Sequence, residues 1–329
     1  MYPWLSARPR IRSRGPRGRN GDGTPRAPDS RHDGPREERV GPIDSLQLKS
    51  PAKINLGLEV LKKRTDSFHD LSSIMLAIDL CDEVRVRYDD GADIAEQREG
   101  FSRSGLTEQA LNAYCNSVSV KTKPNASVKK TIPIAAGLGG GSGNAAVVLS
   151  AANHLSGRAL SDSELADVAS HVGSDVPFFL SGGCALVAGR GEIRKRVLPI
   201  PKVWIVLANP GVELSTPDVF RELDSSEFTS GARTSVLAAS LAAGQPRWNL
   251  MHNGLQGAAE RLCPQIRETL AALRTHTPWT LLSGSGATCF GIFEIEEAAL
   301  AAEKDLAMAG YWTWAGRPMD RWTIADLRI

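Results

Sequence analysis

The feature that most constrains this chain is a glycine-rich loop that runs directly into an apolar helical segment. Five of the seven residues from Gly137 to Gly143 are glycine, and residues 145–149 read AAVVL. Glycine permits positive φ angles and lets backbone N–H groups approach an anion closely, while the first turn of a helix adds unpaired donors and a positive dipole end. The pattern predicts a phosphate-binding loop and makes a nucleotide the first candidate ligand.

Other interpretations of this loop are weaker. A P-loop needs a Lys-Ser or Lys-Thr pair after the glycines, and a dinucleotide fingerprint needs an acidic partner further along the chain, and neither pattern is present. A flexible linker is the plain alternative, although linkers seldom end abruptly in an apolar helix. We therefore expect bound phosphate where the loop meets the helix.

Length and charge narrow the class of protein. The 329 residues are 42% hydrophobic, with a formal net charge of +2, which suits two domains or one large one. Ten arginines against five acidic residues fall within residues 1–41, so the remainder is net negative. The folded body is therefore not basic, which argues against nucleic acid as its partner.

The first 43 residues have a composition of their own. Residues 1–43 are rich in Arg, Pro and Gly and lack a periodic apolar pattern, which predicts a disordered tail. A solvated tail or a mis-assigned start codon is favoured over a nucleic-acid-binding arm, because only Tyr2 and Trp4 interleave with the arginines. The acidic residues argue against an organellar transit peptide.

Cysteine usage and hydropathy predict a cytoplasmic location. The five cysteines are scattered without metal-ligand spacing, as expected of reduced and mostly buried thiols. No run approaches eighteen apolar residues, and the N-terminus lacks the apolar core of a signal peptide, so a membrane partner is not expected.

Hydrophobic periodicity predicts a mixture of strands and helices, either α/β or α+β, with the best domain boundary at Pro199 and Pro201. A capping box at residues 161–164 is expected to open one of the helices, and Gly157 to end another. The expected strands cover residues 46–61, 71–88, 127–130, 184–188 and 203–208, and the expected helices 106–114, 143–155, 161–172, 235–243, 254–274 and 296–309.

Three further segments carry polar residues suited to chemistry. Lys53 and Asn55 lie two positions apart on a probable strand and therefore share a face, although an edge-strand lysine beside a turn is the alternative. Asp175 lies in a small and apolar segment, where a nearby lysine would stabilise it, unless it only caps a helix. Residues 283–288 form a second glycine turn before an apolar strand, for which a tight hairpin is the alternative.

In order along the chain, the PAKIN, PIAAGLGGGS, GSDVP and GSGA segments resemble the motifs of the GHMP kinase superfamily, whose members transfer the γ-phosphoryl group of ATP to a small-molecule alcohol. The resemblance covers roughly residues 47–312. It implies an α+β, two-domain kinase, with residues 44–199 as the N-terminal ATP-binding domain, residues 200–329 as the C-terminal domain and the active site in the cleft between them. The motif order is most similar to the branch that phosphorylates a cytidine diphosphate-linked alcohol in non-mevalonate isoprenoid biosynthesis.

The resemblance assigns roles on the phosphate side. It implies that Asp175 accepts the proton of the acceptor hydroxyl and that Lys53 orients the site and stabilises its charge. Mg²⁺ is implied as a cofactor beside ATP, and Ser142 is the candidate ligand, but the family often has a second serine where this chain has Gly143, so the metal assignment stays open. The implied ATP-binding residues are Lys130, Pro133, Gly137, Leu138, Gly139, Gly140, Gly141, Ser142 and Gly143.

The resemblance also implies a cytosine site. Phe68 and Phe220 would stack on the base and His69 would supply its hydrogen bond, while ordinary core packing is the alternative for both aromatic rings. Phe68 keeps the stacking face of the tyrosine that the family has here but loses its hydroxyl. The implied substrate-binding residues are Asn55, Phe68, His69, Thr216, Phe220, Gly284, Ser285 and Gly286.

One departure concerns the adenine side, where Ser104-Gly105-Leu106 stands in place of the family's acidic-Asn-Leu, so an amide is missing and weaker ATP binding is expected. Two other functions stay open. The chain is alternatively a GHMP kinase for another alcohol, such as homoserine or mevalonate, or a degenerate nucleotide-binding regulatory protein. Phe68, His69 and Phe220 favour the cytidine ligand, and the retained Lys53 and Asp175 argue against a dead enzyme. Oligomeric state and turnover are not predicted from these residues.

Overall fold

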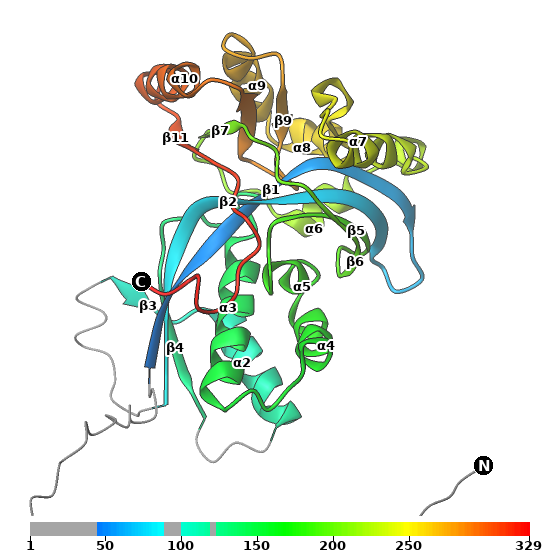
Figure 1. Cartoon of the computed structure of the whole chain (residues 1–329). Helices are drawn as coiled ribbons and strands as arrows, with labels where there is room; N and C mark the ends of the chain where they lie inside the picture. The colour runs from blue at the N-terminus through cyan, green and yellow to red at the C-terminus, as the bar shows by residue number, and fades with distance from the viewer. Residues whose placement is uncertain (1–44, 89–99, 119–122) are drawn as a thin grey trace, which may run out of the picture. The chain divides into compact units, whose positions relative to one another are not determined.

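The computed structural model describes residues 45–88, 100–118 and 123–329, which belong to one compact unit, Pro42–Ile329. The predicted disordered tail, residues 1–43, lies outside the described residues. Elements are labelled as in Figure 1.

Two long antiparallel strands form the centre of the molecule. β1 (Ser45–Lys63) pairs with β2 (His69–Arg87) along their whole lengths, and residues from Ser50 to Val60 are all buried. Because both faces of this stretch are covered, it reads as a continuous apolar run interrupted by a few polar side chains, Lys53 and Asn55 among them. These polar residues therefore enter the core on a strand.

β1 and β2 belong to a seven-stranded sheet of order β3-β4-β2-β1-β8, in which β5 also pairs with β2 and with β6. The pairs are antiparallel except for β1 with β8. The other strands of this sheet are β3 (Phe101–Ser102), β4 (Asn125–Lys129), β5 (Cys184–Gly189), β6 (Ile193–Leu198) and β8 (His252–Asn253).

Helices cover one side of the long hairpin (Figure 1). α3 packs most deeply, because eleven of its sixteen residues are buried and most of them are small or apolar. It joins Tyr114 of α2 and Phe179 of α5 in a single core cluster. The helices on this side are α2 (Gly105–Ser117), α3 (Gly140–Leu155), α4 (Asp162–Val172) and α5 (Val176–Phe179).

A second, four-stranded sheet of order β11-β7-β10-β9 lies on the other side of the hairpin with the later helices (Figure 1). Its strands are β7 (Trp204–Asn209), β9 (Thr280–Leu282), β10 (Cys289–Phe293) and β11 (Trp312–Gly316). The accompanying helices are α6 (Thr216–Arg221), η1 (Ser225–Glu227), α7 (Ala232–Ala242), η2 (Trp248–Leu250), α8 (Gln256–Leu262), α9 (Gln265–Arg274) and α10 (Glu296–Met308).

The helices and largely antiparallel sheets confirm the predicted α+β class, and the capping box of α4 is present with both of its hydrogen bonds. One expected helix was wrong, because residues 254–274 form two helices that part at Cys263 and Pro264, where a proline cannot continue the first. α3 begins at Gly140, three residues before the expected start. β6, α6 and β11 were not expected at all.

Other expectations have mixed outcomes. The five cysteines are free thiols, three of them buried, as expected. Within the described residues, no helix is long and apolar enough to cross a membrane. The domain boundary at Pro199 and Pro201 and the placement of the active site in a cleft between two domains stay predictions.

Candidate active site

A cavity of about 1000 Å³ gathers the segments that the sequence singled out. Its walls come from β1, the turn between β1 and β2, the glycine loop, the start of α5, α6 and the turn between β9 and β10. The predicted site residues that line it are Lys53, Asn55, Phe68, His69, Lys130, Pro133, Gly137, Leu138, Gly139, Gly140, Gly141, Ser142, Asp175, Thr216, Phe220, Gly284 and Ser285.

Two predicted site residues stand behind the cavity wall. A β-carbon at Gly143 would lie 2.7 Å from the carbonyl oxygen of Pro51, so this glycine lets α3 pack tightly on β1. A β-carbon at Gly286 would lie 2.8 Å from the side chain of Leu282, and its φ is +87°. Both glycines therefore shape the wall from the side that faces the core.

The glycine loop presents an open helix N-terminus to the cavity. Gly139 occupies the N-cap of α3 in the left-handed region, with φ +69°, and no side chain caps this helix. The first turn of α3 holds no acidic residue. Its backbone N–H groups and its positive dipole end are therefore directed at whatever anion occupies the cavity.

Close packing explains why the loop needs glycine. A β-carbon at Gly137 would lie only 2.0 Å from the carbonyl oxygen of Ser283, and one at Gly139 would lie 3.0 Å from the ring of Phe179. The Ser283 hydroxyl also donates to the Gly137 carbonyl at 3.0 Å. The loop and the β9–β10 turn, almost 150 positions apart, therefore form one surface.

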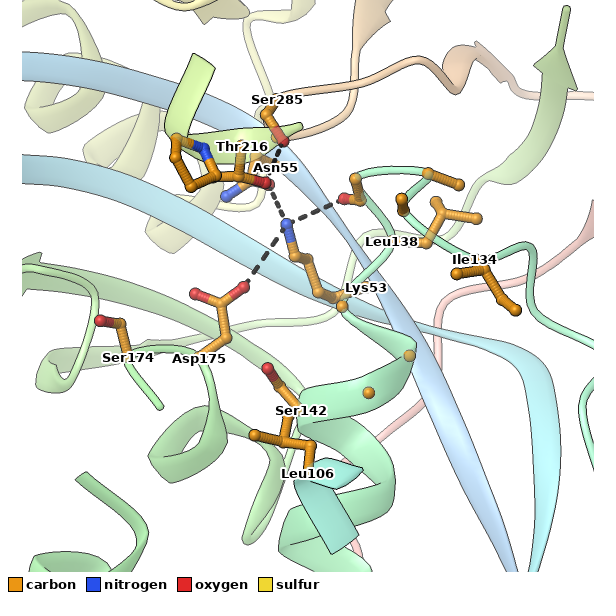
Figure 2. A pocket seen from close by; sticks show the side chains of 18 of the residues that line it. Lys53, Asn55, Leu106, Ile134, Leu138, Ser142, Ser174, Asp175, Thr216 and Ser285 are labelled. Carbon is orange, nitrogen blue, oxygen red and sulfur yellow. Dashed lines mark hydrogen bonds and ion pairs between the residues drawn. The ribbon is translucent and has the colours of Figure 1, made fainter. Parts of the chain in front are cut away.

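Lys53 lies at the centre of the site, as Figure 2 shows. Its Nζ donates to Asn55 Oδ1 at 2.6 Å and to the Gly137 carbonyl at 3.0 Å, and it lies 3.8 Å from Asp175 Oδ2. The side chain is 5% exposed, and burial lowers the pKa of Lys53, an effect that the neighbouring Asp175 carboxylate partly offsets. The two-residue spacing of Lys53 and Asn55 on one strand face is confirmed.

A hydrogen-bond chain orients Asn55 behind the lysine. Asn55 Nδ2 donates to Ser73 Oγ at 2.8 Å, and Ser73 Oγ donates to the Gly57 carbonyl at 2.7 Å. Because Nδ2 is the donor, Oδ1 is left to accept from Lys53. Asn55 thus accepts one hydrogen bond from the Lys53 ammonium group. The same ammonium group also contacts the Gly137 carbonyl of the glycine loop and the Asp175 carboxylate.

Asp175 occupies the N-cap position of α5 but makes no side-chain capping bond there. The alternative in which this residue only caps a helix is therefore wrong. Its side chain is 30% exposed and is the only acidic one among the residues that line the cavity. The carboxylate is thus accessible to a ligand on one side and paired with Lys53 on the other.

The β9–β10 turn closes over the opposite side of the lysine. A β-carbon at Gly284 would lie 3.0 Å from Lys53 Nζ, so only glycine fits there. Buried Asn253 holds this turn by donating to the carbonyls of Leu282 and Gly284 at 2.9 and 2.7 Å. Next to it, the Ser285 and Thr216 hydroxyls are hydrogen-bonded at 2.7 Å (Figure 2).

The aromatic residues form the far end of the cavity. The rings of His69 and Phe220 stack with centroids 5.0 Å apart and an interplanar angle of 22°, and the ring of Phe68 is stacked by the Arg190 guanidinium, 4.8 Å from its centroid. Phe68 is 49% exposed, which argues against the core-packing alternative for this residue. Burial lowers the pKa of His69, and nearby Lys63 lowers it further.

A buried carboxylate anchors the start of the glycine loop. Asp82 accepts from the backbone N–H groups of Thr131 and Ile132 at 2.7 and 2.8 Å, from Asn144 Nδ2 at 2.9 Å and from Lys130 Nζ. Lys130 therefore reaches the cavity as expected but is tied to Asp82. Asn144 also lines the cavity, and its buried Oδ1 has no hydrogen-bond partner within the described residues.

Comparison with known proteins places the chain in a family. The profile of the GHMP kinases N terminal domain matches residues 105–183, and that of the GHMP kinases C terminal domain matches residues 238–309. The chain is 36% identical over 277 residues to 4-diphosphocytidyl-2-C-methyl-D-erythritol kinase of Geobacter metallireducens, with 82% of this chain and 97% of the relative covered. This chain belongs to the GHMP kinases.

Further GHMP kinases extend the comparison. The kinase of the same name from Shouchella clausii is 39% identical over 262 residues, which cover 76% of this chain and 86% of the relative. A crystal structure of 4-(cytidine 5'-diphospho)-2C-methyl-D-erythritol kinase superposes with a TM-score of 0.68 at 32% identity, covering 83% of this chain and 99% of that one. Homoserine kinase from Cytophaga hutchinsonii has a TM-score of 0.64 at 18% identity over 85% and 96% of the two chains, which shows a shared fold.

Sequence reasoning missed three polar residues of this GHMP kinase site: Asn144, Arg190 and Asn253. Asn144 directly follows the predicted loop, and the helical periodicity of this segment could have identified it, since it lies on the buried face of α3. Arg190 and Asn253 come from segments with no motif of their own, and only the tertiary contacts bring them to the site. The pattern of residues could not have identified those two.

Proposed function

We propose that this protein catalyses the ATP-dependent phosphorylation of the 2-hydroxyl of 4-diphosphocytidyl-2-C-methyl-D-erythritol, a step of non-mevalonate isoprenoid precursor biosynthesis. The observation that carries the proposal is that one cavity holds an uncapped helix N-terminus, a Lys–Asp pair and an aromatic stack. These three features suit, in turn, a triphosphate, a reacting hydroxyl and a pyrimidine. The relatives of that name, at 36% and 39% identity, support the same assignment.

The phosphoryl transfer follows from the geometry of the first two features. The triphosphate of ATP lies against the N–H groups of Gly140, Gly141 and Ser142, which stabilise its charge without any movement of the protein. The acceptor hydroxyl lies at Asp175, which takes its proton as the oxygen attacks the γ-phosphorus and the bond to ADP breaks. Asp175 is suited to this role because it is exposed to the cavity and held by Lys53.

Lys53 supplies positive charge between the two substrates. Its Nζ already contacts the Gly137 carbonyl of the phosphate loop and the Asp175 carboxylate of the acceptor side. In a buried position this charge interacts more strongly with the γ-phosphoryl oxygens than it would in water. The lysine therefore holds the acceptor base in place and stabilises the transferred group.

The residues present also fit Mg²⁺, the second predicted cofactor. Mg²⁺ keeps several waters and is usually held by one or two protein oxygens together with substrate phosphates. Ser142 and Asp175 line the cavity and offer such oxygens, whereas the described residues contain no group of three or more His, Cys, Asp or Glu that would hold a metal alone. When bound, the ion would neutralise charge on the triphosphate.

The acceptor side explains the preference for a cytidine group. A pyrimidine that enters beside the His69–Phe220 stack gains stacking area, and the neutral imidazole of His69 offers one donor or acceptor to the base. The walls at this end come from residues 67–69 and from α6, which lie together because the β1–β2 turn meets α6. A small acceptor such as homoserine or mevalonate would leave this end of the cavity empty.

The adenine base of ATP lies at the side of the cavity that Lys130 and Ile134 line. The cavity suits two polyanionic substrates, because its lining holds one carboxylate, that of Asp175, against six lysines and arginines: Lys53, Lys63, Arg103, Lys130, Arg190 and Arg221. The amide missing at Gly105 removes one contact, and Asn144 Oδ1 is a buried acceptor to which no donor among residues 45–88, 100–118 and 123–329 is hydrogen-bonded. ATP is the proposed donor, as in the rest of the family, and a cytoplasmic location stays a prediction.

An acceptor panel tests the proposed function. ATP consumption by the full chain is measured with 4-diphosphocytidyl-2-C-methyl-D-erythritol, homoserine and mevalonate as separate acceptors. We expect turnover with the first acceptor alone. Turnover with homoserine or mevalonate would support another GHMP kinase, and ATP binding without turnover on any of the three would support a regulatory protein.

A further inference from the structure

One turn of the fold reaches both ends of the cavity. The turn of residues 189–192 begins at the last residue of β5 and leads into β6, and Gly189 and Gly191 adopt φ angles of +69° and +116° there. A β-carbon at Gly191 would lie 3.4 Å from Asp175 Oδ1, so the turn packs directly on the carboxylate that accepts the proton. Its neighbour, Arg190, stacks on the ring of Phe68. Two consecutive residues therefore connect the reacting centre to the aromatic end.

Arg190 places a positive charge in the interval of the cavity between Asp175 and the aromatic end. The backbone N–H of Arg190 donates to Glu192 Oε2 at 2.6 Å, which folds the turn back on itself, and its side chain lines the cavity with 29% exposure. Nε lies 4.0 Å from Glu192 Oε1, which is longer than a hydrogen bond. Lys63 and Arg221 also line the cavity, but both are exposed, and Arg221 is hydrogen-bonded to Asp218 at 2.6 Å. Arg190 is thus the cation best placed to meet a ligand in this interval.

We propose that Arg190 binds the diphosphate of the acceptor and selects a pyrimidine nucleoside diphosphate over a nucleoside without phosphate. This inference rests on the proposed function. An acceptor whose base lies at the His69–Phe220 stack and whose hydroxyl lies at Asp175 has its diphosphate between them, where the 189–192 turn runs. The planar guanidinium matches two phosphate oxygens at once, and it does so while remaining stacked on an aromatic ring.

The competing role for Arg190 is purely one of support. In that role the guanidinium holds Phe68 in place through a cation–π contact, and the acceptor never touches it. The two roles differ in how the residue affects ligands of increasing phosphate content. A support would affect cytidine and cytidine diphosphate alike, whereas a diphosphate ligand would affect only the latter.

The test is calorimetric binding of cytidine, cytidine monophosphate and cytidine diphosphate to the full chain and to three variants. Arg190→Gln removes the charge, and Arg190→Lys keeps the charge without the planar fork. Lys195→Gln is the matched control, because Lys195 is an exposed cation on the adjoining strand β6 and does not line the cavity. Thermal unfolding of each preparation confirms that the variants are folded.

We expect Arg190→Gln to weaken binding of cytidine diphosphate about 10–100-fold and of cytidine less than about twofold, as for loss of a charged hydrogen bond. Arg190→Lys should recover part of the loss, and Lys195→Gln should change neither ligand. Equal losses for cytidine and cytidine diphosphate, or no loss for either, would overturn the role of Arg190 alone. If the unaltered protein binds ATP but no cytidine diphosphate, the proposed function itself fails.

Discussion

The two ends of the cavity are built from different materials. At the phosphate end, the surface is mostly backbone: a contiguous glycine loop and the first turn of α3, packed against Ser283 and Phe179. At the acceptor end, the surface is made of side chains, with His69 and Phe220 brought together from positions 151 residues apart and Arg190 added from a third element. Lys53 and Asp175 stand where the two ends meet.

This difference separates a general function from a specific one. A backbone cradle depends on glycines and helix geometry, so it serves any triphosphate-using member of the family equally well. A slot made of side chains changes with single substitutions. We therefore expect variants at the meeting point to affect turnover, variants of the loop to affect ATP, and variants of the slot to affect the acceptor alone.

The largest expected effect is on turnover, with Asp175→Asn. The substitution keeps the size of the side chain but removes the proton acceptor and the negative partner of Lys53, so kcat should fall about 10²–10⁴-fold with ATP affinity little changed. Single-turnover transfer, ATP binding and thermal unfolding are measured on one preparation. Asp305→Asn, an exposed change on α10, is the control. A folded, ATP-binding variant with near-normal transfer would remove Asp175 from catalysis.

The loop is tested with Gly141→Val. A β-carbon at Gly141 has only Leu106 within 4 Å, at 3.5 Å, so the side chain enters the cavity without disturbing the core. ATP affinity should fall about 10–100-fold as donors to the phosphates are obstructed, while the affinity for cytidine diphosphate stays the same. Gly140 is less suitable, because a β-carbon there would lie 3.0 Å from buried Ile132 and would strain the fold.

The ATP affinity of Gly141→Val is measured by calorimetry. Ala298→Val is the control, because it also places a valine in a helix, α10, but outside the cavity. Unchanged ATP affinity in folded Gly141→Val would show that the loop does not cradle phosphate. Equal losses for ATP and cytidine diphosphate would show that the two ends are not independent.

The aromatic slot is tested with Phe220→Ala. Removing the ring that stacks on His69 should raise the acceptor KM about 5–150-fold, since stacking on a base contributes roughly 1–3 kcal/mol. The ATP KM and kcat should change little. Phe228→Ala is the matched control, because Phe228 contacts the edge of His69 but does not line the cavity. An unaltered acceptor KM would return Phe220 to a packing role.

The smallest expected effect is a pH dependence carried by His69. Burial lowers its pKa below the ordinary value of 6.5, so at any given pH more of the imidazole is neutral than in a free histidine, and half-protonation needs a pH below 6.5. The acceptor KM should therefore rise a few-fold as the pH falls below 6.5, because protonation changes the hydrogen bond offered to the base. His69→Asn should remove this rise. A rise of the same size in that variant would assign the titration to another group.

Much of the fold follows from local patterns. The long strands and the α4 capping box were predicted because alternation and caps act within a few residues, whereas α3 begins at Gly140, within the glycines and three residues before its expected start. The 254–274 segment was predicted as one helix because its apolar period continues through Pro264. In the structure the first helix ends before this proline and a second one begins after it. β11 was missed because its pairing with β7 joins positions about a hundred residues apart.

What the sequence determined by itself is the chemistry of each motif: backbone donors at the glycine loop, an ammonium and an amide on one strand face, and one carboxylate in an apolar segment. Only the tertiary structure decided that Lys53 Nζ contacts Gly137 and Asp175 together, that Gly143 and Gly286 lie behind the wall, and that Arg190 joins Phe68. The physical reason is the distance along the chain over which each kind of interaction acts. Backbone conformation and strand-face periodicity depend on near neighbours, whereas the meeting of side chains depends on how the sheets and helices pack.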